Sequence, residues 1–170
     1  MLKIFNDLKP FFEDNYRRIS IREYARLKRI TPPTAKNLLN SYFKEGILKK
    51  QREKRYIFYY ANRDNKVFVD LCRIYWSAVL ERSGFIKHIN KNLFEPVIIV
   101  FGSFASAEIS EQSDIDIAIF SETKKELKLD EFEKKLKRKL QIFVFKNIDD
   151  VKNKELLYSI LNGYLISGRW

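Results

Sequence analysis

Apolar residues recur at helical spacing along the first third of the chain. The first apolar set predicts a helix at the N-terminus, which Pro10 kinks or ends. This set consists of Ile4, Phe5, Leu8, Phe11 and Phe12. A second, short helix is predicted after Ser20, because Glu23 follows three residues later at the spacing of a capping box.

A third helix begins after Thr31, which is a good N-cap, and Pro32 suits its first position. It is predicted to run to about Glu45 and to stop at Gly46. One face is apolar and consists of Ala35, Leu38, Leu39 and Tyr42. The other face is polar and consists of Thr34, Lys36, Asn37, Asn40, Ser41 and Lys44. Because this polar face holds no acidic residue, it can approach the phosphates of a nucleic acid and offer amide groups to base edges. The alternative is an ordinary solvated helix face.

Two strands follow, at Ile47–Gln51 and Tyr56–Ala61. In the second strand Ile57 and Tyr59 alternate with their neighbours at period two. A basic tip, Arg52-Glu53-Lys54-Arg55, joins the two strands. The order is therefore helix, helix and basic hairpin.

The rest of the chain mixes helices and strands. Residues 65–83 predict one long helix that is apolar nearly all round, hence buried on several sides. It forms a homodimer interface or an internal helix wedged between two domains. The further predicted elements are a strand at Val97–Phe101, a short helix at Ser103–Glu108, a strand at Asp114–Phe120, an exposed helix from Asp130 to Lys139, a strand at Leu140–Phe145, a helix at Asp150–Leu161 and a strand at Tyr164–Ser167. The predicted fold class is α+β, with a small α/β module at the C-terminal end.

Net charge also differs between the N-terminal and C-terminal parts of the chain. The 170 residues carry a formal net charge of +11. Residues 1–64 hold 16 Lys/Arg and 7 Asp/Glu, net +9, whereas residues 65–94 carry +3 and residues 95–170 carry −1. This asymmetry suggests one module that binds a polyanion and one with a different task, although generic lysine richness for solubility is the alternative.

The remaining composition narrows the chemistry. With one cysteine, Cys72, and one histidine the chain cannot form an intrachain disulfide or a usual zinc site. Cys72 is expected to be a buried, inert thiol. Any metal must be held mainly by carboxylates, which points to Mg²⁺ or Mn²⁺. No secretory pattern and no apolar run of about 20 residues is present, so we expect a soluble cytoplasmic protein.

Four residues of the C-terminal module carry candidate chemistry. Asp114 and Asp116 alternate on one strand and therefore share a face, while Ile115, Ile117 and Ile119 point into the opposite, core face. Such a pair suits a hard cation, although it can also be an ordinary outward-facing pair on a half-exposed strand. Gly102 lets a phosphate approach the backbone, and Ser103 adds a hydroxyl at a helix N-terminus, where free N–H groups favour anions.

Residues 19–62 resemble the winged helix-turn-helix of prokaryotic transcription regulators. The resemblance rests on the texts Ser-Ile-Arg-Glu-Tyr-Ala from Ser20, Thr-Pro-Pro-Thr-Ala from Thr31 and Lys-Glu-Gly-Ile-Leu from Lys44. It implies that Pro32–Lys44 enters the major groove of double-stranded DNA and that the hairpin contacts the backbone; docking to another protein is the alternative. The candidate DNA-binding residues are Thr34, Lys36, Asn37, Asn40, Lys44, Arg52, Lys54 and Arg55.

The pattern Gly-Ser, ten residues, Asp-x-Asp resembles the minimal nucleotidyltransferases of the DNA polymerase beta-like superfamily. The resemblance covers about residues 95–170. It implies that Gly102 and Ser103 hold a nucleoside triphosphate. It also implies that Asp114 and Asp116 act in catalysis by binding Mg²⁺ or Mn²⁺, so that a nucleotidyl group is transferred to a hydroxyl.

One position departs from that family. A third carboxylate is usual on the next central strand, where this chain has Gln141, which cannot take a proton at neutral pH. Two functions therefore stay open: a DNA-guided nucleotidyltransferase, and a transcription regulator whose nucleotidyltransferase-like domain is inactive.

The expected organisation is a DNA-binding domain at 1–64, a helical connector and possible dimer interface at 65–94, and the nucleotidyltransferase-like domain at 95–170. The expected partners are double-stranded DNA, a nucleoside triphosphate and a second copy of the chain. Family analogy adds a toxin-type protein partner, and no membrane is expected.

Overall fold

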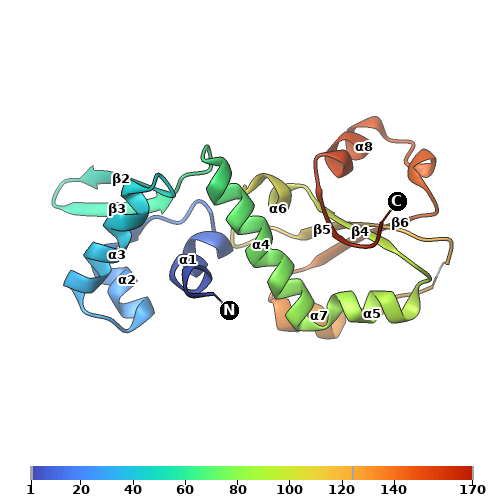
Figure 1. The fold of residues 1–170 in the computed structure, drawn as a ribbon, viewed down its shortest axis with the longest axis horizontal. Helices are drawn as coiled ribbons and strands as arrows, with labels where there is room; N and C mark the ends of the chain where they lie inside the picture. Colours follow the sequence, from blue (N-terminus) through green and yellow to red (C-terminus); the bar gives the residue numbers. More distant parts are fainter. Residues whose placement is uncertain (1, 124, 170) are drawn as a thin grey trace. The chain divides into compact units, whose positions relative to one another are not determined.

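The computed structural model describes residues 2–123 and 125–169, in which eight α-helices and two β-sheets form an α+β protein (Figure 1). These residues divide into two compact units. The N-terminal unit comprises the chain up to Cys72 together with Glu108–Glu111, and the C-terminal unit comprises Arg73–Ala107 and the chain from Gln112 onward. A short segment between two C-terminal elements thus belongs to the N-terminal unit.

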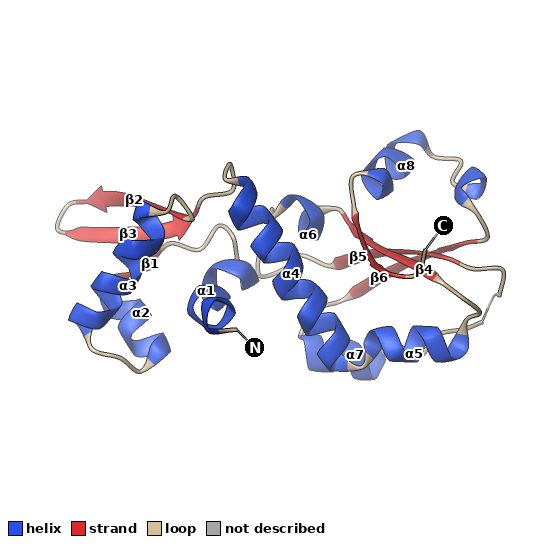
Figure 2. Cartoon of the chain, in the orientation of Figure 1, coloured by secondary structure: helices blue, strands red, loops and turns tan. Residues whose placement is uncertain are grey.

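Three helices and a small sheet make up most of the N-terminal unit. Its elements are α1 (Lys3–Glu13), β1 (Ile19–Ser20), α2 (Ile21–Lys28), α3 (Pro32–Lys44), β2 (Leu48–Glu53) and β3 (Tyr56–Ala61). The sheet is antiparallel in the order β1-β3-β2, and the hairpin of β2 and β3 is visible as the long pair of arrows in Figure 2. Tyr59 and Ala61 turn inward from β3 and are buried.

The predicted helix boundaries are confirmed by their caps. The Ser20 hydroxyl accepts the Glu23 N–H at 3.3 Å and begins α2. Thr31 accepts the Thr34 N–H at 3.4 Å and begins α3, which ends before Gly46 at a φ of +73°. Pro10 lies inside α1 rather than at its end.

A buried carboxylate ties the helices of this unit together. Asp7 of α1 accepts a hydrogen bond from the Tyr42 hydroxyl of α3 at 3.0 Å, and its backbone carbonyl accepts one from Tyr24 of α2 at 2.9 Å. Lys3 adds an ion pair at 2.6 Å. Burial and the Asp7 charge raise the pKa of both tyrosines, so the phenols stay neutral donors.

The long helix α4 (Lys66–Ser83) continues from one unit into the other. Its buried side chains follow one another at spacings of one, three and four residues, and they are Phe68, Cys72, Tyr75, Trp76 and Leu80. Val67 and Ile74 are more than half exposed, so the helix is not buried on all sides. In the described part of the chain no helix is long and apolar enough to cross a membrane.

The C-terminal unit is built around a four-stranded sheet. Its elements after α4 are α5 (Phe85–Asn92), β4 (Val97–Phe101), α6 (Ser103–Ser106), β5 (Ile115–Phe120), α7 (Asp130–Leu136), β6 (Leu140–Phe145), the 3-10 turn η1 (Ile148–Asp150), α8 (Lys154–Leu161) and β7 (Tyr164–Ser167). The strand order is β6-β5-β4-β7, in which β5 and β6 run parallel and the other pairs are antiparallel. Helix α5 lies within the predicted helical connector of residues 65–94 but was not predicted as a separate helix, and η1 and α8 stand where one helix from Asp150 to Leu161 was predicted.

Both faces of this sheet are covered, with α8 on one side and α5 and α7 on the other (Figure 1). Ile115, Ile117 and Ile119 are fully buried, as expected for one face. The opposite face is also a core, because Ala118 and Phe120 pack there with Val151 and Ile160. The aspartate pair therefore lies at the end of an apolar face and not on a solvated one.

Candidate functional site

The turn after β4 brings a glycine against a carboxylate. All five residues of β4 are buried, and the chain leaves the strand at Gly102 with φ +64° and ψ −143°. A Cβ on Gly102 would lie 2.4 Å from Oδ2 of Asp116. Real Cβ contacts do not come closer than about 3.0 Å. This position therefore admits only glycine while Asp116 keeps its place.

Asp116 owes this position to strand pairing. In the antiparallel register Asp116 lies opposite Phe101, the residue before Gly102. Its side chain is half-buried, and burial together with the neighbouring charge of Asp114 raises the pKa of its carboxyl. Asp114 lies just before β5 and is exposed. The pair thus concentrates negative charge at one point, which a divalent cation would relieve.

Ser103 directly follows Gly102 and is the first residue of α6. The Gly102 carbonyl accepts the N–H groups of Ala105 and Ser106 at 3.0 and 3.2 Å, which closes the helical turn directly after the glycine. The structure thus brings Gly102 and Asp116 together, with Ser103 next in the chain and Asp114 two residues before Asp116.

Gln141 lies directly beside Asp116 on the neighbouring strand. The parallel register of β5 and β6 pairs these two residues, so their side chains leave the sheet on the same face. The amide is exposed. Across the described residues no group of three or more Asp, Glu, His or Cys could hold a metal ion.

Two carboxylates suit Mg²⁺ only when other oxygens complete its coordination. Mg²⁺ in proteins is commonly bound through one or two carboxylates, with substrate phosphates and water as the remaining ligands. The donor set fits that mode, because Asp114 and Asp116 supply two carboxylates and Gly102, against which Asp116 lies, has no side chain that would obstruct a phosphate. Asp114 and Asp116 would hold the ion, which would neutralise charge on a bound triphosphate.

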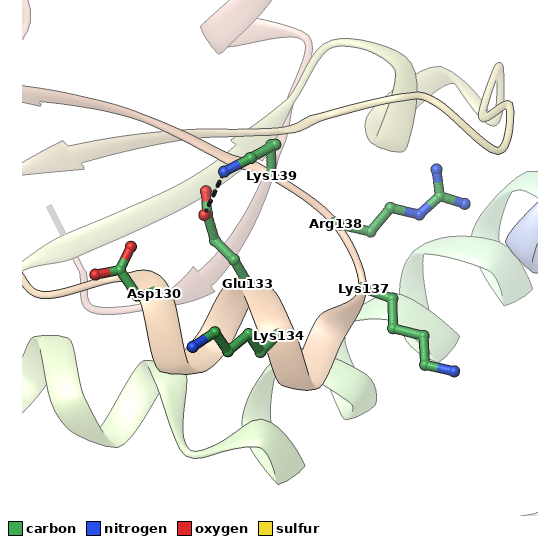
Figure 3. A pocket seen from close by; sticks show the side chains of 6 residues that line it. All are labelled: Asp130, Glu133, Lys134, Lys137, Arg138 and Lys139. Carbon is green, nitrogen blue, oxygen red and sulfur yellow. Dashed lines mark hydrogen bonds and ion pairs between the residues drawn. The ribbon is translucent and has the colours of Figure 1, made fainter.

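A basic hollow of about 480 Å³ lies on α7 and the turn that follows it (Figure 3). Its side chains are those of Asp130, Glu133, Lys134, Lys137, Arg138 and Lys139. Lys139 pairs with Glu133 at 2.9 Å, and Glu133 also accepts the N–H of Leu140, so this ion pair fixes the start of β6.

Arg138 was not singled out from the sequence, although it reaches the candidate site. Its guanidinium donates to the carbonyl of Ser113 at 3.2 Å, directly before Asp114. The Ile115 N–H also donates to the Lys139 carbonyl at 2.9 Å. The run of basic residues from Lys134 to Lys139 is visible in the sequence. Only the fold shows that this run forms hydrogen bonds with the residues on either side of Asp114.

The candidate DNA-binding residues of α3 lie on one exposed side of the N-terminal unit. Thr34, Lys36, Asn37 and Lys44 are exposed, opposite the buried Ala35, Leu39 and Tyr42. Asn40 is half-buried, and its Oδ1 accepts the Tyr59 hydroxyl at 2.7 Å. The amide of Asn40 is thus partly engaged within the unit.

The hairpin tip is shorter than expected. β2 extends to Glu53 and β3 begins at Tyr56, so only Lys54 and Arg55 form the turn, with Lys54 at φ +51°. Arg52 lies within β2, and its Nε donates to the Lys54 carbonyl at 3.4 Å. All three basic side chains are exposed.

The mixed sheet, the glycine turn and the aspartate pair all lie between Val97 and Ser167. Residues 85–169 match the sequence model of the family described as polymerase beta, nucleotidyltransferase. The match covers half of the chain, and the chain belongs to this family. No curated protein sequence matches the chain.

Proposed function

We propose that the C-terminal unit binds a metal–nucleoside triphosphate and transfers its nucleotidyl group to a hydroxyl acceptor. The observation that supports this most directly is the close approach of Asp116 to Gly102, with Asp114 adjacent. Gly102 and Ser103 would lie along the phosphates, while Asp114 and Asp116 would hold the Mg²⁺ or Mn²⁺ that charge balance requires.

In this reaction the acceptor oxygen forms a bond to the α-phosphorus, the bond to the leaving pyrophosphate breaks, and the hydroxyl proton passes to solvent water or to a side-chain base. Gln141 stands beside Asp116 but cannot accept that proton. This observation favours a second candidate, a regulator that binds metal–nucleotide without turnover.

Calorimetry with ATP and Mg²⁺ tests the binding. Asp114→Asn and Asp116→Asn keep the side-chain size, so each is expected to weaken Mg²⁺-dependent binding while circular dichroism stays unchanged. Exposed Asp149, changed to Asn, is the matched control and should bind as the wild type does. Binding that survives in both site variants would show that the site lies elsewhere.

Transfer of labelled nucleotide separates the two candidates. Gln141→Asp supplies a carboxylate beside Asp116, so it should raise transfer and leave nucleotide affinity within about twofold. If the wild type transfers well, and Asp114→Asn and Asp116→Asn abolish transfer, the proton acceptor is another group and the inactive-regulator candidate fails.

We also propose that α2, α3 and the β2–β3 hairpin form a winged helix-turn-helix that binds double-stranded DNA. Support comes from the net charge of +9 in residues 1–64 and from the exposed polar side of α3. Arg52 near the end of β2 and Lys54 and Arg55 in the turn would contact the phosphates. Exposed Val67 and Ile74 of α4 support, in turn, a homodimer that would read two half-sites.

Salt dependence tests the DNA assignment by fluorescence anisotropy. Each phosphate contact contributes about −0.9 to the slope of log affinity against log salt. Replacing Arg52, Lys54 and Arg55 by Ala should flatten the slope, whereas Lys146→Ala in the other unit should not. An unchanged slope in the triple variant would contradict the wing assignment.

A further inference from the structure

The outer face of the N-terminal sheet carries a row of aromatic rings that the proposed duplex contact does not use. Tyr56, Phe58 and Tyr60 alternate on β3 with residues that point inward, of which Tyr59 and Ala61 are buried. Their partners across the β2–β3 ladder are Glu53, Gln51 and Lys49, which share the same face. We call these three rings the aromatic face.

The rings are accessible and lie close to one another. Tyr56 is 56% exposed, and its ring centroid lies 6.5 Å from that of Phe58. Phe58 and Tyr60 are half-buried. Aromatic rings at every second residue of an outward-facing strand face are unusual, because a solvated sheet face normally carries polar side chains.

Arginine side chains lie over these rings and the neighbouring Tyr16. The Arg18 guanidinium carbon is 5.4 Å from the centroid of Phe58 and 5.9 Å from that of Tyr60. Arg63 lies 4.2 Å from the ring centroid of Tyr16, which is 51% exposed. Aromatic rings with guanidinium groups beside them form surfaces on which nucleobases stack.

A hollow of about 260 Å³ extends this surface. Its lining includes Tyr16, Arg18, Lys49, Gln51, Tyr60 and Arg63, which combine rings with donors for phosphates and base edges. The cations are held by exposed ion pairs: Arg18 with Glu53, Lys49 with Asp64, which also lines the hollow, and Arg63 with Glu108. Such pairs contribute little free energy, so a phosphate can replace any of these carboxylates.

We propose that the aromatic face and this hollow bind the unpaired bases of a single-stranded polynucleotide. A protein partner is disfavoured, because residues 1–64 carry a net charge of +9 and arginines border the rings. The face is also separate from the duplex contact: α3 packs on the inner side of the sheet, where Asn40 meets Tyr59. Duplex and single strand would thus occupy opposite sides of one small sheet.

The test measures binding of fluorescein-labelled oligo(dT), oligo(U) and a DNA duplex to the full chain by anisotropy. Replacing Phe58 and Tyr60 together by Ser should weaken single-strand binding about tenfold per ring. The double variant with Phe58→Tyr and Tyr60→Phe keeps both rings and should stay within about twofold of the wild type. Duplex affinity should be unchanged in both variants, which also reports that the unit is folded.

A second readout does not depend on variants of half-buried residues. Oligonucleotide should quench the tyrosine fluorescence of the wild type, and Tyr56→Ser at the exposed end should reduce the quenching. Comparing oligo(dT) with oligo(U) distinguishes DNA from RNA as the source of the bases.

Three results would overturn the proposal. In the first, neither oligonucleotide binds or quenches. In the second, ring removal weakens duplex and single-strand binding equally. In the third, sedimentation shows that removing the rings dissociates a dimer while single-strand affinity is unaltered, so that the face joins two copies of the chain.

Discussion

Replacing Gly102 by alanine perturbs the candidate nucleotide site through a single carbon atom. The added Cβ would lie 2.4 Å from Oδ2 of Asp116, and the contact must open to at least 3.0 Å. The obstructing atom is the far end of a side chain and not backbone, so the carboxylate can move by about 0.6 Å, the difference between these distances, and the fold survives. The displaced group is the one proposed to hold the metal.

The backbone term can be separated from the displacement. Gly102 has φ +64° and ψ −143°, a region that is essentially restricted to glycine, where another residue costs about 1–3 kcal/mol. Gly84 provides the matched control in the same unit, with φ +84° and ψ 2°. Its nearest neighbour to an added Cβ is Phe132 at 4.0 Å, so Gly84→Ala meets strain of about 1–2 kcal/mol without a clash.

The two variants should therefore resemble each other in stability and differ in binding. For a chain of this size each kcal/mol lowers the melting temperature by about 2–4 °C, so we expect a loss of several degrees in both variants. A misplacement near 1 Å at a reacting centre can cost about a hundredfold. Mg²⁺-dependent ATP affinity should fall about tenfold or more in Gly102→Ala and stay near wild type in Gly84→Ala.

Differential scanning calorimetry and titration calorimetry together measure both quantities. If Gly102→Ala binds Mg²⁺–ATP as tightly as the wild type, Asp116 has no part in the site. Equal losses of affinity in Gly84→Ala would show instead that binding follows global stability.

Three further changes have expected outcomes. Because burial and the charge of Asp114 raise the pKa of Asp116, the folded state is favoured at low pH, and this contribution is lost as the pH rises from the usual aspartate pKa through the raised one. Asp114→Asn removes the neighbouring charge, so it should raise the melting temperature of the metal-free protein at neutral pH. Well below about pH 4, where both carboxyls are protonated, the substitution should have no such effect. Asn15→Ala removes a buried amide that donates to the Phe11 carbonyl at 2.7 Å and accepts the Ile109 N–H at 2.8 Å; urea unfolding should show a loss of about 2–5 kcal/mol, against little change for exposed Asn90→Ala. Thr31→Ala removes the cap of α3 and should cost about 1 kcal/mol by the same measurement; an unchanged midpoint would show that the cap is dispensable.

Local sequence was sufficient for most of the secondary structure. The caps Ser20 and Thr31 and the stop at Gly46 each act within one helical turn, so the helix boundaries they set are confirmed. The strands β4 and β6 likewise match their predicted residues, because β4 is a continuous apolar run of five residues and β6 is apolar except for Gln141. The Gly-Ser and Asp-x-Asp pattern also indicated the nucleotidyltransferase family that residues 85–169 confirm.

Other features depend on contacts between residues far apart in the chain. Spacing alone predicted that Asp114 and Asp116 share a face, but only the pairing of β5 with β4 and β6 places Asp116 against Gly102 and beside Gln141. The hydrogen bond from Arg138 to the Ser113 carbonyl joins residues 25 positions apart, and no periodic pattern in the sequence indicates it.

The sequence also could not predict that Glu108–Glu111 belongs to the N-terminal unit. It follows from Asn15, whose side-chain oxygen accepts the Ile109 N–H and whose backbone N–H donates to the Ile109 carbonyl across 94 residues. Helix propensity, helix capping and apolar alternation each depend on residues only a few positions apart, so they can be recognised in the sequence. The register of a sheet and the partner of a buried amide depend on which polar groups, far apart in the chain, must form hydrogen bonds when the core closes. Only the tertiary structure determines these pairings.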